Sequence, residues 1–335
     1  MRWLGLDIGG ANVKLADGCG YAVSQPFALW QRPDDLGQML KCLIAQAPTC
    51  DHIAVTMTGE LADCFQNKTE GVQRILDAVE QAVEGRTTGV YLTCGVLETV
   101  SAARRRVAEV AAANWHALAR FSGRFAPTGP AILIDIGSTT CDLIPLLDGR
   151  PCGEGTNDTE RLLKGELIYS GVMRTPICGL VSHILWQGVP CPVAREWFAT
   201  TRDIYLLTND LPEDPADTNT ADGQTATIEA AQTRLARMVC ADQMSRAEAV
   251  ASARAIAASH ADQLADDIRR MVARMGQPPN TVILSGEGEF LARRALEVVQ
   301  LGAKVVSLKD ELGEGISRCA PAHAVAVLAR EDAIA

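Results

Sequence analysis

The sequence predicts an α/β protein of two similar domains that face each other across a cleft. Three observations support this prediction. Apolar segments of strand length alternate with amphipathic segments of helix length, a pattern typical of mostly parallel sheets covered on both faces. The motif Asp-Ile-Gly occurs twice, at residues 7–9 and 135–137, each time between two apolar runs. The length of 335 residues is sufficient for two domains of ordinary size.

The first element is a β-hairpin at residues 4–16, where an apolar run leads to an aspartate, two glycines, an amide and a second apolar run. Gly9 and Gly10 let backbone N–H groups approach a ligand without interference from a Cβ atom. Lys14 adds a positive charge on the returning strand. A carboxylate such as Asp7 tolerates a nearby phosphate when a cation lies between them. The hairpin therefore predicts a site for an anionic ligand.

The rest of the first half alternates between strands and helices. Apolar spacing predicts strands at residues 21–30, 52–57 and 89–93, and helices at residues 34–47, 71–83 and 100–120. Glu60 follows the strand at 52–57, and ligands of such sheets bind beyond the carboxyl ends of strands. We expect a first domain at residues 1–125, with residues 121–130 as the linker because they contain two glycines and two prolines.

The second half opens with a hairpin at residues 132–146 that repeats the first design. Asp135 ends an apolar run, a small polar turn follows, and Asp142 begins the second run. A second domain is expected at residues 131–320. Its residues 149–245 read as a loop-rich and helical insertion, in which the polar, acidic stretch 208–225 is predicted to be a mobile surface loop.

The end of the chain carries a second ligand-binding pattern. A capping box at residues 245–248 begins a long helix, which stops at Gly276. The strand at 281–284 then leads through a glycine-rich turn into a helix at 290–300, as in phosphate and nucleotide platforms. A strand at 304–308 follows, and a last helix at 321–333 can return to the first domain.

Composition excludes several classes of function. The net charge of −10 and the pI near 5.1 exclude a nucleic-acid partner, which requires a basic face. Eleven scattered cysteines and five histidines without ligand spacing predict reduced, mostly buried thiols rather than disulfides or a zinc site. Asp7 interrupts the first apolar run, so no signal peptide is expected, and no apolar stretch is long enough to span a bilayer. We expect a cytoplasmic protein.

Together these segments resemble the actin, sugar kinase and Hsp70 ATPase-like superfamily, whose members have two ribonuclease H-like domains around an interdomain cleft. Three further segments are more particular: TMTGELAD at residues 56–63, YSGVMRTP at 169–176 and FATTRDIY at 198–205. Through them the whole chain is similar to the hydantoinase/oxoprolinase-related proteins that are linked to tetrahydromethanopterin-dependent one-carbon transfer.

The resemblance implies a transferase of methanofuran-type cofactor biosynthesis. The implied reaction joins an aminomethyl-furfuryl diphosphate to the phenol of a glutamylated tyramine or tyrosine and releases diphosphate. Diphosphate leaves only if Mg²⁺ and fixed donors stabilise its growing charge. We expect Asp7 and Asp135 to hold Mg²⁺. The expected phosphate- or nucleotide-binding residues are Gly9, Gly10, Asn12, Lys14, Gly137, Ser138, Thr139, Thr140, Ser285, Gly286, Glu287 and Gly288.

Four residues receive catalytic or substrate-binding roles under this reading. A phenol has a pKa of about 10 and needs a base; Glu60 is the first candidate and Asp142 the second. Lys14 supplies a catalytic cation, and Arg174 can bind a substrate carboxylate with two hydrogen bonds. Three of these residues also have a structural interpretation. Glu60 could be a carboxylate that stabilises the start of a helix, Arg174 could hold a loop in place, and Lys14 could be a strand residue that faces solvent.

Two other functions stay open at this stage. One is an ATP-dependent small-molecule kinase, or a hydantoinase-like enzyme that hydrolyses ATP. Glu287 and Glu289 weaken it by placing negative charge where ATP would lie, although Glu287 could contact a ribose. The other is a nucleotide-switched assembly protein without catalysis. The expected partners are small-molecule diphosphate and phenolic substrates, with no nucleic acid and no membrane, and a homodimer stays open.

Overall fold

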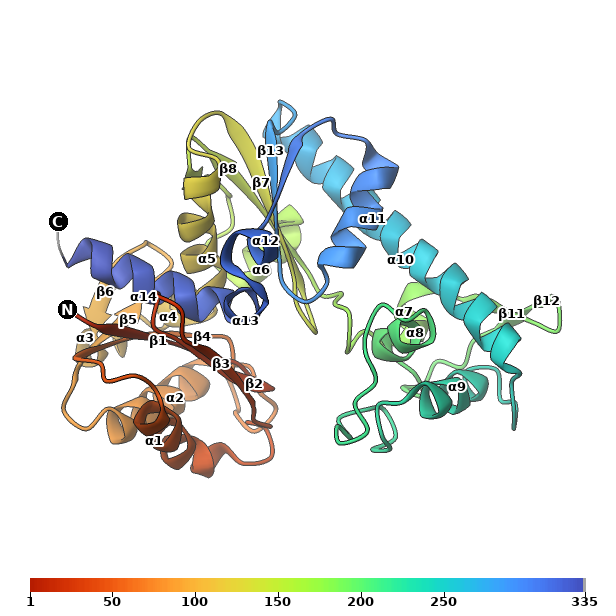
Figure 1. Ribbon diagram of the computed structural model, residues 1–335, viewed down its shortest axis with the longest axis horizontal. Helices are drawn as coiled ribbons and strands as arrows, with labels where there is room; N and C mark the ends of the chain where they lie inside the picture. Colours follow the sequence, from red (N-terminus) through yellow and green to blue (C-terminus); the bar gives the residue numbers. More distant parts are fainter. Residues whose placement is uncertain (334–335) are drawn as a thin grey trace.

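Two six-stranded sheets form the centres of two α/β domains in the computed structural model, which describes residues 1–333 (Figure 1). The first sheet has the order β3-β2-β1-β4-β5-β6. The elements of this domain are β1 (Trp3–Ile8), β2 (Asn12–Ala16), β3 (Ala22–Pro26), α1 (Leu36–Gln46), β4 (His52–Met57), α2 (Lys68–Ala82), β5 (Thr87–Tyr91) and β6 (Leu97–Thr99). Apolar side chains of α1 and α2 pack on one face of this sheet.

The second sheet has the order β10-β8-β7-β13-β14, and β9 pairs with β8. Its domain contains β7 (Pro130–Ile136), β8 (Cys141–Leu147), β9 (Arg150–Pro151), α6 (Asp158–Lys164), β10 (Leu167–Ile168), β13 (Thr281–Ser285), α11 (Glu289–Val299), β14 (Lys304–Ser307), α12 (Leu308–Leu312) and α13 (Glu314–Arg318). In both domains an antiparallel hairpin is followed by two parallel strands on its other side. The two sheets therefore share one topology.

Three short helices replace the single helix that the sequence predicted at residues 100–120. They are α3 (Val100–Ala103), α4 (Val107–Val110) and α5 (Asn114–Ser122). Ala112 has a φ of 50°, which a continuous helix cannot contain. The break redirects α5, so that Trp115 and Leu118 pack with apolar residues of the second sheet. Helix α5 thus belongs to the contact between the domains.

A helical insertion extends from the second domain (Figure 1). It contains α7 (Ile177–Leu180), β11 (His183–Trp186), β12 (Val189–Pro192), α8 (Thr201–Leu207) and α9 (Ile228–Arg237), and α10 (Arg246–Met275) connects it back to the sheet. Ser245 and Glu248 form the expected capping box of α10, and Gly276 ends this helix in a left-handed conformation.

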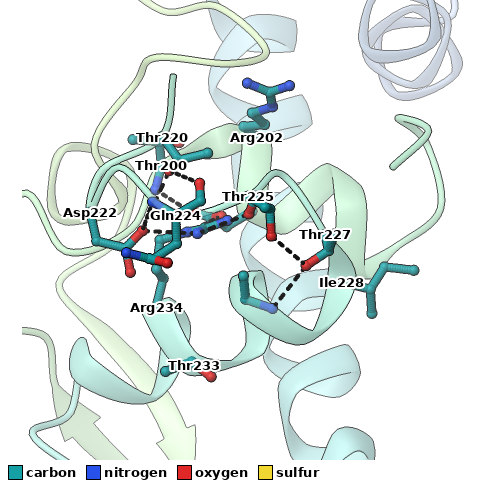
Figure 2. Close-up of polar contacts among 12 residues, drawn as sticks. Thr200, Arg202, Thr220, Asp222, Gln224, Thr225, Thr227, Ile228, Thr233 and Arg234 are labelled. Carbon is teal, nitrogen blue, oxygen red and sulfur yellow. Dashed lines mark hydrogen bonds and ion pairs between the residues drawn. The ribbon is translucent and has the colours of Figure 1, made fainter. Parts of the chain in front are cut away.

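The stretch expected to be a mobile loop, residues 208–225, is anchored by two buried arginines, Arg202 and Arg234, and Figure 2 shows the contacts around Arg234. The Arg234 guanidinium lies 2.7 Å from the Asp203 carboxylate and 3.0 Å from that of Asp222. Arg202 binds Asp217 at 2.6 Å. Because charged groups this deeply buried are stable only when paired, these contacts fix the loop against α8 and α9.

The last helix, α14 (Ala320–Asp332), returns to the first domain and lies against β1, β4 and α5 (Figure 1). The approach to β1 is close: a Cβ atom on Gly5 would lie 2.0 Å from the carbonyl oxygen of Ala322. Only glycine permits this contact. Among residues 1–333, no helix combines the length and the apolar character that crossing a membrane requires.

Candidate active site

A cleft of about 670 Å³ separates the two domains and is lined by both. It brings together almost every residue that the sequence analysis singled out: Asp7, Gly9, Gly10, Asn12, Lys14, Glu60, Asp135, Gly137, Ser138, Thr139, Thr140, Asp142, Arg174, Ser285, Gly286 and Glu287. Gly288 does not line the cleft. A Cβ atom there would lie 2.4 Å from Cγ2 of Ile136, so Gly288 allows the turn to pack against β7.

The two Asp-Ile-Gly hairpins have the same turn. The N–H of Gly9 donates to the carbonyl oxygen of Asn12 at 2.9 Å, and the N–H of Gly137 donates to that of Thr140 at the same distance. Each turn leaves the carboxyl end of the central strand of its sheet, where ligands of α/β sheets bind. Glycines and small polar residues of both turns line the cleft, one turn from each domain.

A second duplicated segment follows the strand beside each hairpin. Thr56 on β4 is paired with Asp7, and Ser285 on β13 is paired with Asp135. Residues 56–60 (TMTGE) and 285–289 (SGEGE) are therefore equivalent. A hydroxyl residue followed by Gly-Glu occurs at 58–60 and at 285–287, but the strand register makes Thr58 equivalent to Glu287 and not to Ser285. Thr58, which lines the cleft, was missed for this reason.

Two aspartates lie at the centre of the cleft in unfavourable surroundings for a charge. Asp7 is 4% exposed, and its Oδ1 has no hydrogen-bond partner within the described residues. Burial raises the pKa of Asp7 to about 6, against the opposing effect of Lys14. Burial, together with the charge of Asp142, raises the pKa of Asp135 to about 6 as well. A bound cation would stabilise the ionised form of both carboxylates and lower their pKa values.

The aspartates fit a magnesium ion bound together with a phosphate ligand. Across residues 1–333, no three His, Cys, Asp or Glu side chains form a cluster able to hold a metal. Mg²⁺ does not require one, because it is usually held by one or two carboxylates, water and substrate phosphates. The unpartnered Oδ1 of Asp7 is an oxygen ligand of the required kind.

Lys14 on β2 is the cross-strand partner of Asp7 on β1. Burial alone would lower the pKa of Lys14, but the carboxylates of Asp7, Glu287 and Asp135 outweigh burial and raise that pKa. Lys14 is therefore protonated, and its positive charge lies near the carboxylates of Asp7 and Asp135. Glu287 is exposed and has no ion-pair partner among residues 1–333, and it adds negative charge beside this group.

Glu60 is a buried carboxylate at one end of the cleft. Its side chain is 1% exposed, and its Oε2 has no hydrogen-bond partner in the described part of the chain. Burial raises the pKa of Glu60 to about 7; the charge of Asp158 raises it further, and that of Lys68 lowers it. Asp158 and Lys68 form an ion pair of 2.8 Å that joins α6 to α2 across the cleft. Glu60 can therefore exchange a proton near neutral pH.

Asp142, the second candidate base, is engaged by another side chain. The Arg161 guanidinium lies 2.7 Å from the Asp142 carboxylate and 4.1 Å from the centre of the Trp115 ring. Arg161 is almost completely buried. Burial raises the pKa of Asp142, and Arg161 opposes that rise.

The segment YSGVMRTP at residues 169–176 holds the second hairpin. The backbone N–H groups of Val172 and Arg174 donate to the carbonyl oxygens of Gly137 and Ser138, at 3.1 Å and 3.0 Å. A Cβ atom on Gly171 would lie 2.5 Å from the backbone nitrogen of Thr139. Only a glycine permits so close an approach, so this segment fixes the position of the turn.

The segment FATTRDIY at residues 198–205 braces YSGVMRTP in turn. The Thr201 hydroxyl donates to the carbonyl oxygen of Gly171 at 2.8 Å. His260 on α10 lies between the hydroxyls of Ser170 and Tyr205, each 2.8 Å from one ring nitrogen. Burial lowers the pKa of His260 to about 4, so a neutral imidazole links both segments to α10.

The end of the cleft near Glu60 is aromatic. The Arg174 guanidinium lies over the Trp30 ring, 5.2 Å from its centre. Tyr169 and Trp197 line the same cleft and are 60% and 50% exposed. Sequence reasoning missed the two tryptophans, because isolated aromatic residues in loops have no pattern of their own.

Comparisons with known proteins agree with these features. The hydantoinase/oxoprolinase family profile matches residues 51–331. The chain is 34% identical over 330 residues to a (4-{4-[2-(gamma-L-glutamylamino)ethyl]phenoxymethyl}furan-2-yl)methanamine synthase of Methanocaldococcus jannaschii, which covers 97% of this chain and 96% of that protein. A protein of the same name from Methanococcus vannielii is 29% identical over 205 residues, covering 60% of this chain and 91% of that protein.

Solved structures show the fold. A nucleotide-free acetone carboxylase structure matches 94% of this chain and 51% of its own chain, with a TM-score of 0.51 and 13% identity. The archaeal actin homologue Ta0583 matches 99% of this chain and all of its own, with a TM-score of 0.49 and 12% identity. The shared sheet topology and the first similarity confirm the predicted fold: two ribonuclease H-like domains of the actin, sugar kinase and Hsp70 ATPase-like type around a cleft.

Proposed function

The chain belongs to the hydantoinase/oxoprolinase family, and on that premise we propose that it is a transferase of methanofuran-type cofactor biosynthesis. In the proposed reaction, an aminomethyl-furfuryl diphosphate and the phenol of a glutamylated tyramine or tyrosine form an aryl ether and diphosphate. The name of the Methanocaldococcus jannaschii relative describes such a product, with a phenoxymethyl bridge to a furan that carries an amine. The unpaired cysteines suit a cytoplasmic enzyme.

One observation supports the proposal: a single cleft is lined by both hairpin turns and by the buried carboxylates of Asp7 and Glu60. We assign the turns and Asp7 to the diphosphate and Glu60 to the phenol. A reaction that expels diphosphate and deprotonates a phenol needs these two features side by side.

The residues act on the two halves of the reaction. The bond between the furfuryl carbon and the diphosphate oxygen breaks, while the phenol oxygen forms a new bond to that carbon. Lys14 and the N–H groups of the two turns bind the departing diphosphate. Glu60 accepts the phenol proton, because a pKa of about 7 leaves it ionised in about half of the molecules at neutral pH and able to act as a base. Asp7 and Asp135 would hold Mg²⁺, which supplies further charge neutralisation on the diphosphate.

Asp142 is not assigned as the base. Its carboxylate is held by Arg161 at 2.7 Å, and releasing it would leave a buried arginine without its partner. We propose that the pair supports the second hairpin instead, because Asp142 lies directly opposite Asp135.

The alternative is an ATP-dependent kinase or a hydantoinase-like enzyme that hydrolyses ATP. One observation favours it: residues 285–288 connect β13 to α11 as a nucleotide platform would. Glu287 does not separate the two functions, since a carboxylate beside Lys14 would repel the phosphates of a nucleotide and a diphosphate alike.

The experiment that tests the proposal uses the full-length chain with Mg²⁺, aminomethyl-furfuryl diphosphate and γ-glutamyltyramine, without nucleotide. We expect equal amounts of ether and diphosphate, measured by mass spectrometry and a diphosphate assay, and neither product with Asp7→Asn. Absence of ether with all glutamylated acceptors, together with ADP release from Mg-ATP, would overturn the proposal in favour of the alternative.

A further inference from the structure

Two opposite charges at the aromatic end of the cleft have no partner. Asp63 and Arg174 both line the cleft and are exposed. Neither forms an ion pair or a side-chain hydrogen bond with any residue from 1 to 333, including each other. Charged side chains without a role in folding, placed in a cleft, are candidates for ligand binding.

A chain of contacts places the two charges at the same end. Cys64, next to Asp63, donates its Sγ hydrogen to the carbonyl oxygen of Leu29 at 3.7 Å. Trp30, next to Leu29, lies under the Arg174 guanidinium at 5.2 Å. Asp63 comes from the first domain and Arg174 from the second, so a ligand bound by both would bridge the two domains.

This end adjoins the diphosphate site at Arg174, whose backbone N–H donates to the carbonyl oxygen of Ser138 at 3.0 Å, and Asp63 lies on the first-domain side of it. The carboxylates that act on Lys14 are Asp7, Glu287 and Asp135, not Asp63. The charges near Tyr169 include Arg174, Glu60 and Lys68. The aromatic end is therefore the Glu60 end of the cleft, where the acceptor phenol would lie under the proposed function.

We propose that Asp63 and Arg174 bind the α-amino acid head group of the acceptor. Arg174 receives the carboxylate through two hydrogen bonds, and Asp63 receives the ammonium group. Trp30, Tyr169 and Trp197 provide faces against which the acceptor ring and linker pack. The inference rests on the proposed function and adds to it the part of the acceptor that the protein selects.

Two sources can supply this head group. A γ-glutamyl substituent has a free ammonium and a free carboxylate on one carbon, and tyrosine has the same pair on its own backbone. Tyramine lacks the pair. An acceptor without the head group would forgo two charge-assisted hydrogen bonds, one to Asp63 and one to Arg174, and should therefore react less efficiently.

The test compares γ-glutamyltyramine, tyrosine and tyramine as acceptors at fixed donor concentration. We expect kcat/KM for one of the two amino acid acceptors to exceed that for tyramine. This ratio should fall about tenfold or more in Asp63→Asn and in Arg174→Gln, as expected for lost charge-assisted hydrogen bonds. Asp262→Asn and Arg254→Gln, which change exposed charges outside the cleft, should keep the wild-type ratio.

A ratio that is unchanged in both cleft variants would overturn the inference, and so would a wild-type enzyme without preference over tyramine. Calorimetry with each acceptor and the full-length chain separates this inference from the proposed function. If no ether forms but amino acid acceptors bind and Asp63→Asn weakens them, only the proposed reaction fails. If ether forms and binding does not depend on the head group, only the inference fails.

Discussion

Lys14 and Asp142 occupy the same position in the two hairpins: Lys14 lies directly across from Asp7, and Asp142 lies directly across from Asp135. The negative charge of Asp142 is met by Arg161 at 2.7 Å, whereas Lys14 forms no ion pair with the residues that the structure describes. The duplicated hairpins have thus diverged at one position. We propose that the first provides a cation for a ligand, whereas the carboxylate of the second is paired with Arg161 within the protein.

Lys14→Met should weaken diphosphate binding about 10- to 100-fold, because a hydrogen bond to a charged partner contributes about 1.5–3 kcal/mol. Calorimetry with Mg²⁺ and diphosphate measures this change. Lys304→Met, which alters an exposed lysine on β14, serves as the matched control. Equal affinities for the wild type and Lys14→Met would contradict the role of Lys14.

Asp7→Asn should abolish Mg²⁺-dependent diphosphate binding and stabilise the protein without metal. Unfolded Asp7 loses its proton near pH 3.8 and folded Asp7 near pH 6, so its ionisation lowers the free energy of unfolding as the pH rises between these values. At pH 7.5 the variant should gain about 1–3 kcal/mol. Urea denaturation in EDTA measures the gain, with Asp262→Asn as the control. A variant that binds diphosphate normally would refute the metal assignment.

Glu60 should produce the acidic limb of the pH–rate profile. A base must be ionised, so the rate should rise with pH to a plateau above the pKa of about 7. Glu60→Gln should remove this limb and lower kcat about 100- to 10,000-fold, while diphosphate affinity reports on an intact cleft. Retention of the limb in this variant would assign the base to another residue.

The charges of Lys68 and Asp158 should shift the pKa of Glu60 in opposite directions. The charge of Asp158 raises the pKa of Glu60 and that of Lys68 lowers it. Asp158→Asn should therefore move the acidic limb to lower pH, and Lys68→Met should move it to higher pH. Shifts of opposite sign cannot come from a general loss of stability, since both variants break the same 2.8 Å contact. Shifts in one direction would indicate a change in domain closure instead.

Gly171→Ala should displace the second hairpin, because the new Cβ atom would lie 2.5 Å from the backbone nitrogen of Thr139. We expect a loss of stability of about 1–3 kcal/mol and weaker diphosphate binding. Gly179→Ala is the matched control, since a Cβ atom at Gly179 meets nothing within 4 Å. Thermal unfolding and calorimetry of both variants check this prediction.

Local sequence patterns were sufficient to predict much of the fold. The two hairpins follow from Asp-Ile-Gly between apolar runs, because turn residues and alternation determine that geometry within about 15 residues. The ends of α10 were predicted for the same reason, since the Ser245 cap and Gly276 act on neighbouring backbone groups. The roles proposed for the cleft residues, in contrast, stay predictions until they are measured.

Contacts between distant residues account for what was missed. Lys68 and Asp158 meet across the cleft, and 90 positions separate them in the chain. The stretch 208–225 looked mobile because the arginines that anchor it lie outside it, at positions 202 and 234. The thiols were expected to be mostly buried, but only Cys141 and Cys319 are; short local windows do not show which side of an element faces water.

The return of α14 to the first domain affects the order in which the two domains can fold during synthesis. Domains usually fold from the amino terminus as they emerge, but β1 needs the Ala322 backbone against Gly5 to complete its packing. The amino-terminal half therefore keeps one face of its sheet uncovered until α14 has been synthesised. The second half, although synthesised later, can bury its own sheet first.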